Sequence, residues 1–216
     1  MDDASPQGAS RLAIAVGIIG AGSAISLGTF FAFGGPFGTL NDIGNGALGL
    51  LSAALAWRLR DGAREVKRDL ATWTAVAGGA ITVVGSYLVI SGTTGYFQAG
   101  LVSTAGFAGI GAWVLSHSRD HITASSRGLR GLGLAAGALM ALGALAVPGI
   151  VLQLDAMANA PGWIWLAETA WLGTYVVYPA WTIWLGTAAM RSRRVAPTSA
   201  SHGPDEREGH PSWTGG

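Results

Sequence analysis

The chain has 216 residues, of which half are apolar and only 12% are charged, and its formal net charge is +1. A soluble domain carries about twice that fraction of charged residues, so the composition favours an integral membrane protein with one domain. The sequence contains no cysteine, which excludes disulfides, thiol catalysis and cysteine-ligated metal sites.

Six apolar runs follow one another along the chain. Because a helix needs about 20 residues to cross a bilayer, we expect an all-α, polytopic membrane bundle of six transmembrane helices that occupies residues 12–190. The second run is the shortest, with eighteen residues. The runs extend over residues 12–33, 40–57, 70–90, 97–116, 129–154 and 163–190.

The basic residues lie on one side of this predicted bundle. The connections 34–39, 91–96 and 155–162 contain no Lys or Arg, whereas 58–69 and 117–130 are rich in Arg. The remaining basic residues precede the first run or follow the last one. Since cytoplasmic loops carry an excess of Lys and Arg, the pattern predicts a plasma-membrane protein with both termini in the cytoplasm.

The two ends of the chain are polar. We expect residues 1–11 to form a short cytoplasmic N-terminus. Asp2 and Asp3 give it the wrong charge for a signal peptide, so the first run is expected to be a true span. Residues 191–216 are rich in Pro, Ser, Gly and charge, which predicts a disordered cytoplasmic tail. The preference for Arg over Lys and the many Gly and Ala residues indicate a bacterial origin.

Small residues recur at helical spacing in the runs. Gly133 and Gly137 form a GxxxG pattern, which we interpret as a helix contact within one bundle rather than a dimerisation site. A faint repeat, aligned on Trp57 and Trp113, is compatible with three helical hairpins. We expect Pro148 and Pro179 to kink the fifth and sixth helices.

Three acidic residues lie outside the predicted cytoplasmic loops and tails: Asp42, Asp155 and Glu168. Counting about 20 residues back from Arg58 places the outer boundary near Gly38, so that Asp42 lies about one turn inside the membrane. The same counting places Asp155 in water and Glu168 at the interface. Asp42 and Glu168 are therefore the candidate catalytic residues.

Amides and tyrosines of the outer halves of the runs are the groups available to assist these carboxylates. We expect ligand binding by a set of five such residues. The set comprises Asn41, Asn45, Gln98, Tyr175 and Tyr178.

Asp42 carries the sharpest inference. It shares a helical face with Gly46, Gly49 and Ala53, a stripe that should face other helices. With no Lys or Arg in the outer half, its partner must be an amide, a hydroxyl, water, a bound cation or its own proton. The alternative is that Asn41 or Asp42 caps the N-terminus of the second helix and sits in the headgroup region.

His117 and His121 have the i, i+4 spacing of a ligand pair, but two histidines in a basic loop do not make a closed metal site. We therefore expect no metal and no cofactor. The basic loops are expected to contact anionic lipid headgroups, and nothing indicates nucleic-acid binding.

Three classes of function remain open. The first is a protein with an outward-facing polar site for a small solute, a cation, a proton or a lipid, and this is the class that we favour. The second is a membrane enzyme that acts on a lipidic or isoprenoid substrate by carboxylate acid–base chemistry. The third is an accessory subunit that packs against a membrane partner or a second copy of the chain.

Overall fold

The computed structural model describes residues 6–60, 66–120 and 126–194, which contain helices and no strand. The helices form six successive runs. The first four are α1 (Pro6–Phe33), α2 (Phe37–Arg58), α3 (Val66–Ile90) and α4 (Tyr96–Asp120). The fifth comprises α5 (Arg127–Ala141), η2 (Leu142–Leu145) and α6 (Ala146–Val151). After the short η3 (Met157–Asn159), the sixth comprises α7 (Ile164–Glu168), α8 (Ala170–Leu172), η4 (Gly173–Val177) and α9 (Tyr178–Arg194).

Four segments of the described chain are long and apolar enough to cross a membrane: Gln7–Phe33, Asp69–Ile90, Tyr96–Arg119 and Arg127–Val151. They coincide with the predicted first, third, fourth and fifth runs. The second run is less apolar because α2 carries Asn41, Asp42 and Asn45. The sixth run is divided, and its longest helix, α9, has 17 residues.

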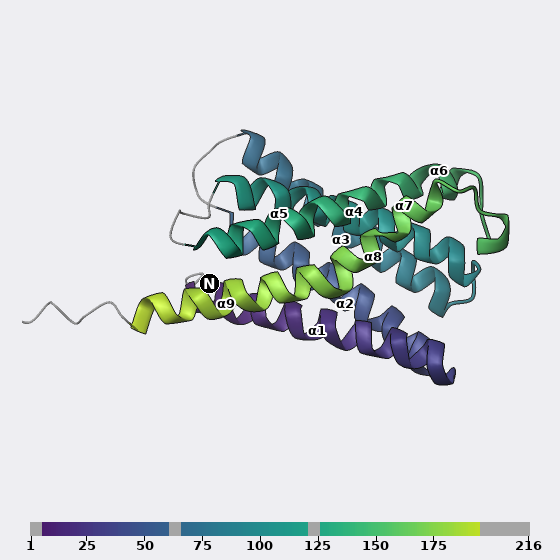
Figure 1. The fold of residues 1–216 in the computed structure, drawn as a ribbon, viewed down its shortest axis with the longest axis horizontal. Coiled ribbons are helices and arrows are strands. Elements are labelled where there is room, and N and C mark those ends of the chain that lie inside the picture. Colours follow the sequence, from purple (N-terminus) through teal and green to yellow (C-terminus); the bar gives the residue numbers. More distant parts are fainter. Residues whose placement is uncertain (1–5, 61–65, 121–125, 195–216) are drawn as a thin grey trace, which may run out of the picture.

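The contacts between the runs form a closed ring in chain order. Each of α1 to α4 contacts the next run, and α9 returns to pack against α1 and α5. The helix α4 lies nearest the centre, since it also contacts α2, α6 and α8. The start of α1 and the end of α9 therefore lie at the same end of the bundle (Figure 1).

Glycine lets the helix backbones approach one another closely. A Cβ on Gly49 of α2 would lie 2.9 Å from the carbonyl oxygen of Gly79 in α3, and one on Gly111 of α4 would lie 3.0 Å from that of Gly137 in α5. The GxxxG pair therefore packs within the bundle, and the α2 stripe faces another helix, as the sequence predicted. Since lipid removes most of the hydrophobic drive between helices, such close packing is what holds the bundle together.

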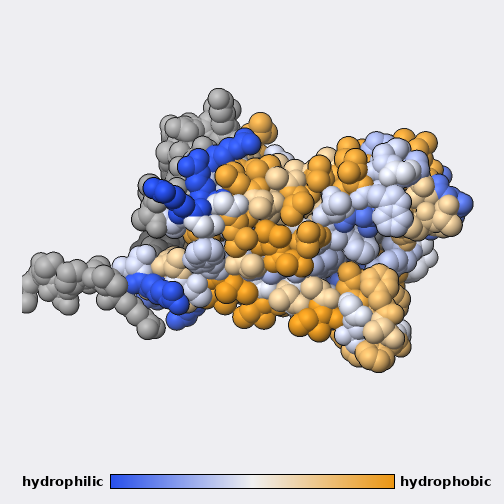
Figure 2. All heavy atoms as spheres, viewed as in Figure 1, coloured by the Kyte–Doolittle hydropathy of each residue, from blue (hydrophilic) through white to orange (hydrophobic). Residues whose placement is uncertain are grey.

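The surface has an apolar band between two more polar ends (Figure 2). Large apolar side chains are exposed on several helices, including Ile18, Leu50, Ile81, Val84 and Val147. A soluble monomer rarely exposes apolar area on this scale. The apolar helices and this surface fit a membrane location.

Several helix boundaries differ from the predicted ones. The first helix begins at Pro6 instead of residue 12, the second at Phe37 instead of residue 40, and the last ends at Arg194, inside the predicted tail. The fifth run ends at Val151 instead of residue 154, because Gln153 has a positive φ of 52° that an α-helix cannot accommodate. Residues 195–216, which form most of the predicted tail, lie outside the described residues.

The two prolines each follow a departure from α-helical geometry. The 3-10 segment η2 lies just before Pro148, and the π-helical segment η4 lies just before Pro179. Proline cannot donate a backbone hydrogen bond to the preceding turn. The last run is consequently irregular over η4, whereas the sequence predicted one continuous helix with a kink.

Candidate functional site

A pocket lies between the start of α2, the end of α3, the start of α4 and the irregular part of the sixth run. Its volume is about 30 Å³, which is room for about two or three water molecules. The polar residues that line it come from three of these four elements. They are Asn41, Asp42, Asn45, Tyr96, Ser103, Thr104, Trp171, Thr174 and Tyr175.

Asp42 supplies the carboxylate of the pocket. The turn before α2 is made by Gly34 and Gly35, which both have positive φ angles (68° and 71°) that glycine tolerates. The N-cap of α2 is Pro36, without a side-chain cap. Asp42 therefore lies beyond the first turn of α2, and its side chain is only 8% exposed. The alternative that Asn41 or Asp42 caps this helix is wrong.

Asn41 lies beside Asp42 and is 2% exposed. Its Nδ2 lies 3.5 Å from Oδ1 of Asp42, which is the outer limit of a hydrogen bond. Its Oδ1 is buried and has no hydrogen-bond partner. A buried acceptor without a partner costs free energy, so this oxygen marks a place where a donor or a cation would be stabilised.

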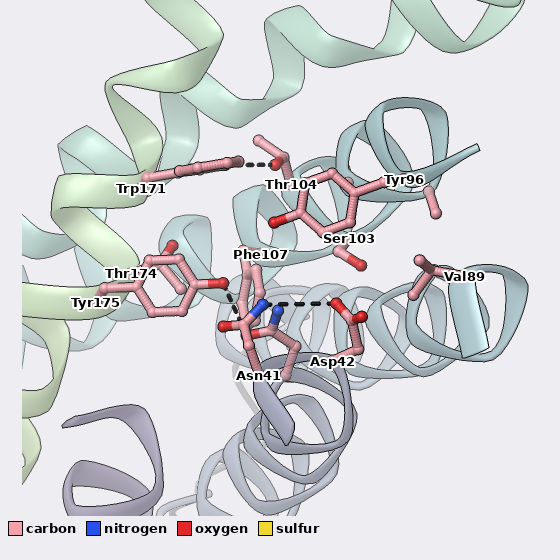
Figure 3. Close-up of a pocket in the computed structure, with 14 residues that line it drawn as sticks. Asn41, Asp42, Val89, Tyr96, Ser103, Thr104, Phe107, Trp171, Thr174 and Tyr175 are labelled. Atoms are coloured by element: carbon pink, nitrogen blue, oxygen red, sulfur yellow. Dashed lines mark hydrogen bonds between the residues drawn. The ribbon is translucent and has the colours of Figure 1, made fainter. Parts of the chain in front are cut away.

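Two tyrosines enter the pocket from opposite sides (Figure 3). The hydroxyl of Tyr175, in η4, donates a hydrogen bond of 2.9 Å to Oδ1 of Asn45 in α2. Tyr96, the first residue of α4, directs its hydroxyl toward the interior of the pocket (Figure 3). Tyr96 is 39% exposed, the most exposed polar residue of the lining.

Hydroxyl groups complete the polar wall. Ser103 and Thr104 belong to α4 and Thr174 to η4, and all three are buried. The hydroxyl oxygen of Thr104 accepts a hydrogen bond of 3.3 Å from Nε1 of Trp171. Sequence reasoning missed these hydroxyls, although the spacing of Tyr96, Ser103 and Thr104 places them near one face of a helix.

The sequence-predicted site residues divide into two groups. The pocket contains Asn41, Asp42, Asn45 and Tyr175. It does not include Gln98, Glu168 or Tyr178. Glu168 is the last residue of α7 and is half-buried, and Gln98 is half-buried in the first turn of α4. Asp155 is exposed.

Tyr178 lies deeper in the bundle, at the start of α9, and is fully buried. Its hydroxyl donates a hydrogen bond of 2.9 Å to Oγ of Ser52 in α2. Together with the Tyr175–Asn45 bond, this contact joins α2 to the sixth run at two levels.

We expect Tyr178→Phe to lower the free energy of unfolding by about 1–3 kcal/mol, because it leaves the buried Ser52 hydroxyl without its donor. Tyr87→Phe is the matched control, since Tyr87 is 65% exposed, and its effect should stay within about 0.5 kcal/mol. Unfolding in mixed micelles, followed by circular dichroism, gives both values. Equal stabilities of the two variants would contradict a structural role for the Tyr178–Ser52 bond.

His117 packs against two tryptophan rings. Its ring stacks on Trp113 at 5.6 Å and meets Trp181 edge-on at 6.3 Å. His121 lies outside the described residues. Within the described ranges, no group of three His, Asp or Glu side chains could hold a metal ion.

The described residues offer no cation to Asp42. The lining contains no Lys, Arg or His, and the ion pair found in the described residues joins Arg60 to Asp69, at 2.8 Å, near the other end of α2. The site can thus hold a positive or neutral guest and disfavours an anion.

Comparisons of the chain with family models, with curated proteins and with solved structures gave no match.

Proposed function

We propose that the chain is a multi-pass plasma-membrane protein that crosses the bilayer six times, with both termini in the cytoplasm. Four runs have the length and hydropathy of spans, and the other two pack alongside them within the same ring. An even number of antiparallel crossings returns the chain to the side where it began, which agrees with the start of α1 and the end of α9 at one end of the bundle (Figure 1).

Basic residues support this orientation. Arg11 lies near the start of α1, Arg58 ends α2, Arg119 lies near the end of α4, and Arg127 begins α5. These helix ends gather at one end of the bundle, where hydrophilic side chains are visible (Figures 1 and 2). An excess of Arg is typical of the cytoplasmic side.

The function that we propose is binding of a small solute in an outward-facing pocket. One observation carries it: a buried carboxylate, Asp42, lines a small polar pocket at the end of the bundle opposite these arginines. Ionisable groups at such positions are expensive and usually functional. The pocket also lies at a broken helix, which is where membrane transporters commonly bind their substrates.

The other two classes have less support. A lipidic substrate needs a far larger cavity than one with room for about two or three water molecules. Glu168, the second carboxylate of the enzyme hypothesis, is absent from the lining. An accessory subunit would leave the buried carboxylate of Asp42 without a role.

Cysteine accessibility tests the proposal directly, because the chain has no native cysteine. We expect Ser103→Cys, in the pocket, to react with Ag⁺ that is added briefly, as the nitrate, outside intact cells, because this thiol-reactive ion is small enough to enter the pocket. A thiol that has bound Ag⁺ is then protected from alkylation. Ser91→Cys, in the exposed turn after α3, should react from the same side. Ser192→Cys, exposed near the end of α9, should react only after the membrane is permeabilised.

Ser52→Cys is the matched buried control, because Ser52 is fully buried and does not line the pocket. It should stay unmodified under all conditions. If Ser103→Cys behaves like Ser52→Cys while Ser91→Cys reacts, the pocket does not face outward. If Ser192→Cys reacts in intact cells, the orientation is wrong.

A further inference from the structure

The charge of the pocket narrows the class of ligand. Asp42 is the one charged residue in the lining, and its neighbour Asn41 offers it an amide N–H only at the 3.5 Å limit. A carboxyl group in this setting is stabilised when it pairs with a positive charge, when water solvates it, or when it takes up a proton and becomes neutral.

Asn41 provides a second, independent indication. Its Oδ1 is an acceptor without a partner on a side chain that is 2% exposed. Asn41 lies next to Asp42 in the wall of the pocket (Figure 3). The amide nitrogen of Asn41 faces Asp42, and rotation of the amide about the Cβ–Cγ bond would bring Oδ1 to this side. A cation beside both side chains would then satisfy the carboxylate and the amide oxygen together.

The remaining wall is rich in oxygen. Tyr96, Tyr175, Ser103 and Thr174 bring hydroxyl oxygens to the pocket, and hard cations prefer oxygen ligands. A single carboxylate balances one positive charge, so a divalent cation would remain uncompensated. The volume of about 30 Å³ admits an ion with one or two waters and excludes organic cations of amino-acid size.

We propose that the solute bound in the pocket is a small monovalent cation, Na⁺ or K⁺, held by the carboxylate of Asp42 and by Oδ1 of Asn41. The hydroxyl groups of the wall complete its shell. This proposal rests on the proposed function, because it names the ligand of the same pocket. The hydrogen bond from Tyr175 to Asn45 fixes the position of Tyr175 at the pocket wall, which ties the site to the sixth run.

Radioactive ²²Na⁺ binding to the full chain in lipid nanodiscs tests the proposal, with choline chloride as the balancing salt. We expect saturable binding that unlabelled NaCl or KCl displaces, and the order of displacement identifies the preferred ion. Asp42→Asn should abolish the binding. Asn41→Leu, which removes the orphaned acceptor together with the amide N–H beside Asp42, should weaken it by about 10- to 100-fold.

Asp155→Asn is the matched control, since Asp155 is an exposed carboxylate in the loop after α6, and it should bind ²²Na⁺ like the unmodified protein. An Asp155→Asn variant that loses binding along with Asp42→Asn would mean that a general surface charge holds the ion, and the proposal would be overturned. Asn41→Leu keeps the carboxylate and provides a readout even if Asp42→Asn fails to fold.

The failure of this proposal differs from the failure of the proposed function. If Ser103→Cys reacts from outside but the protein binds neither ²²Na⁺ nor a competing K⁺, the pocket faces outward and its ligand is not a monovalent metal cation. If Ser103→Cys does not react, the outward-facing pocket itself is wrong, whatever the ion measurement shows.

Discussion

Gly106→Leu is expected to prevent assembly of the bundle. A Cβ at Gly106 of α4 would lie 2.6 Å from the carbonyl oxygen of Gly78 and 2.6 Å from the backbone nitrogen of Thr82, both in α3. Backbone atoms of a packed helix cannot turn away as a flexible side chain can, so the two helices would have to separate. We expect a loss of roughly 3 kcal/mol or more in the free energy of unfolding.

Gly28→Leu is the control for this change. Gly28 lies in α1 with no atom within 4 Å of the position of a Cβ, so the leucine would point into open space. Leucine also favours helix more than glycine does, and this variant should be at least as stable as the unmodified protein. Thermal unfolding in nanodiscs compares the two, and equal stability would show that α3 and α4 do not pack through Gly78 and Gly106.

Trp181→Ala is expected to have the second-largest effect. Trp181 is fully buried, stacks on Tyr178 at 6.0 Å between ring centroids and meets Trp113 edge-on at 6.1 Å. Truncation of such a residue costs about 3–5 kcal/mol in soluble proteins. In a bilayer, moving the indole ring from the protein core to lipid contributes little free energy, whereas the lost packing contacts still count. We therefore expect Trp181→Ala to lower the free energy of unfolding by about 3 kcal/mol.

Trp165→Ala provides the comparison, because Trp165 belongs to α7 of the same run and is 61% exposed. Its replacement should change the free energy of unfolding by less than about 1 kcal/mol. Unfolding of both variants by denaturant in one lipid mimic measures the difference. A Trp181→Ala variant as stable as Trp165→Ala would contradict the aromatic core between α4 and α9.

The helical architecture follows from local properties of the sequence. A span needs a continuous apolar segment of sufficient length, and each such segment can be recognised without knowledge of its neighbours. The predicted helix ends were less accurate. Gly34 and Gly35 form the turn before α2, so this helix begins earlier than the apolar pattern predicts, and Gln153 ends the fifth run before the predicted residue 154. The positive φ angles of these residues cannot be predicted from apolar composition alone.

The candidate site could be predicted only in part. The depth of Asp42 in the predicted membrane followed from counting residues back from Arg58. The lack of a Lys or Arg near Asp42 followed from the distribution of charged residues along the sequence. The structure brings Asn41, Asn45 and Tyr175 to that carboxylate and leaves Gln98 and Glu168 outside the pocket. Depth is a property of one helix, whereas proximity depends on how neighbouring helices are rotated.

The sequence by itself determined that this protein is helical, that several of its helices are apolar enough to cross a membrane, and that Asp42 is the unusual carboxylate. Only the tertiary structure decided which side chains line the pocket with Asp42 and which helices are joined around it. Tyr175 and Asn45 are 130 residues apart in the chain, and Tyr178 and Ser52 are 126 apart. Contacts of this kind depend on close packing of glycine faces and on the π-helical segment before Pro179, and helical periodicity carries no information about either.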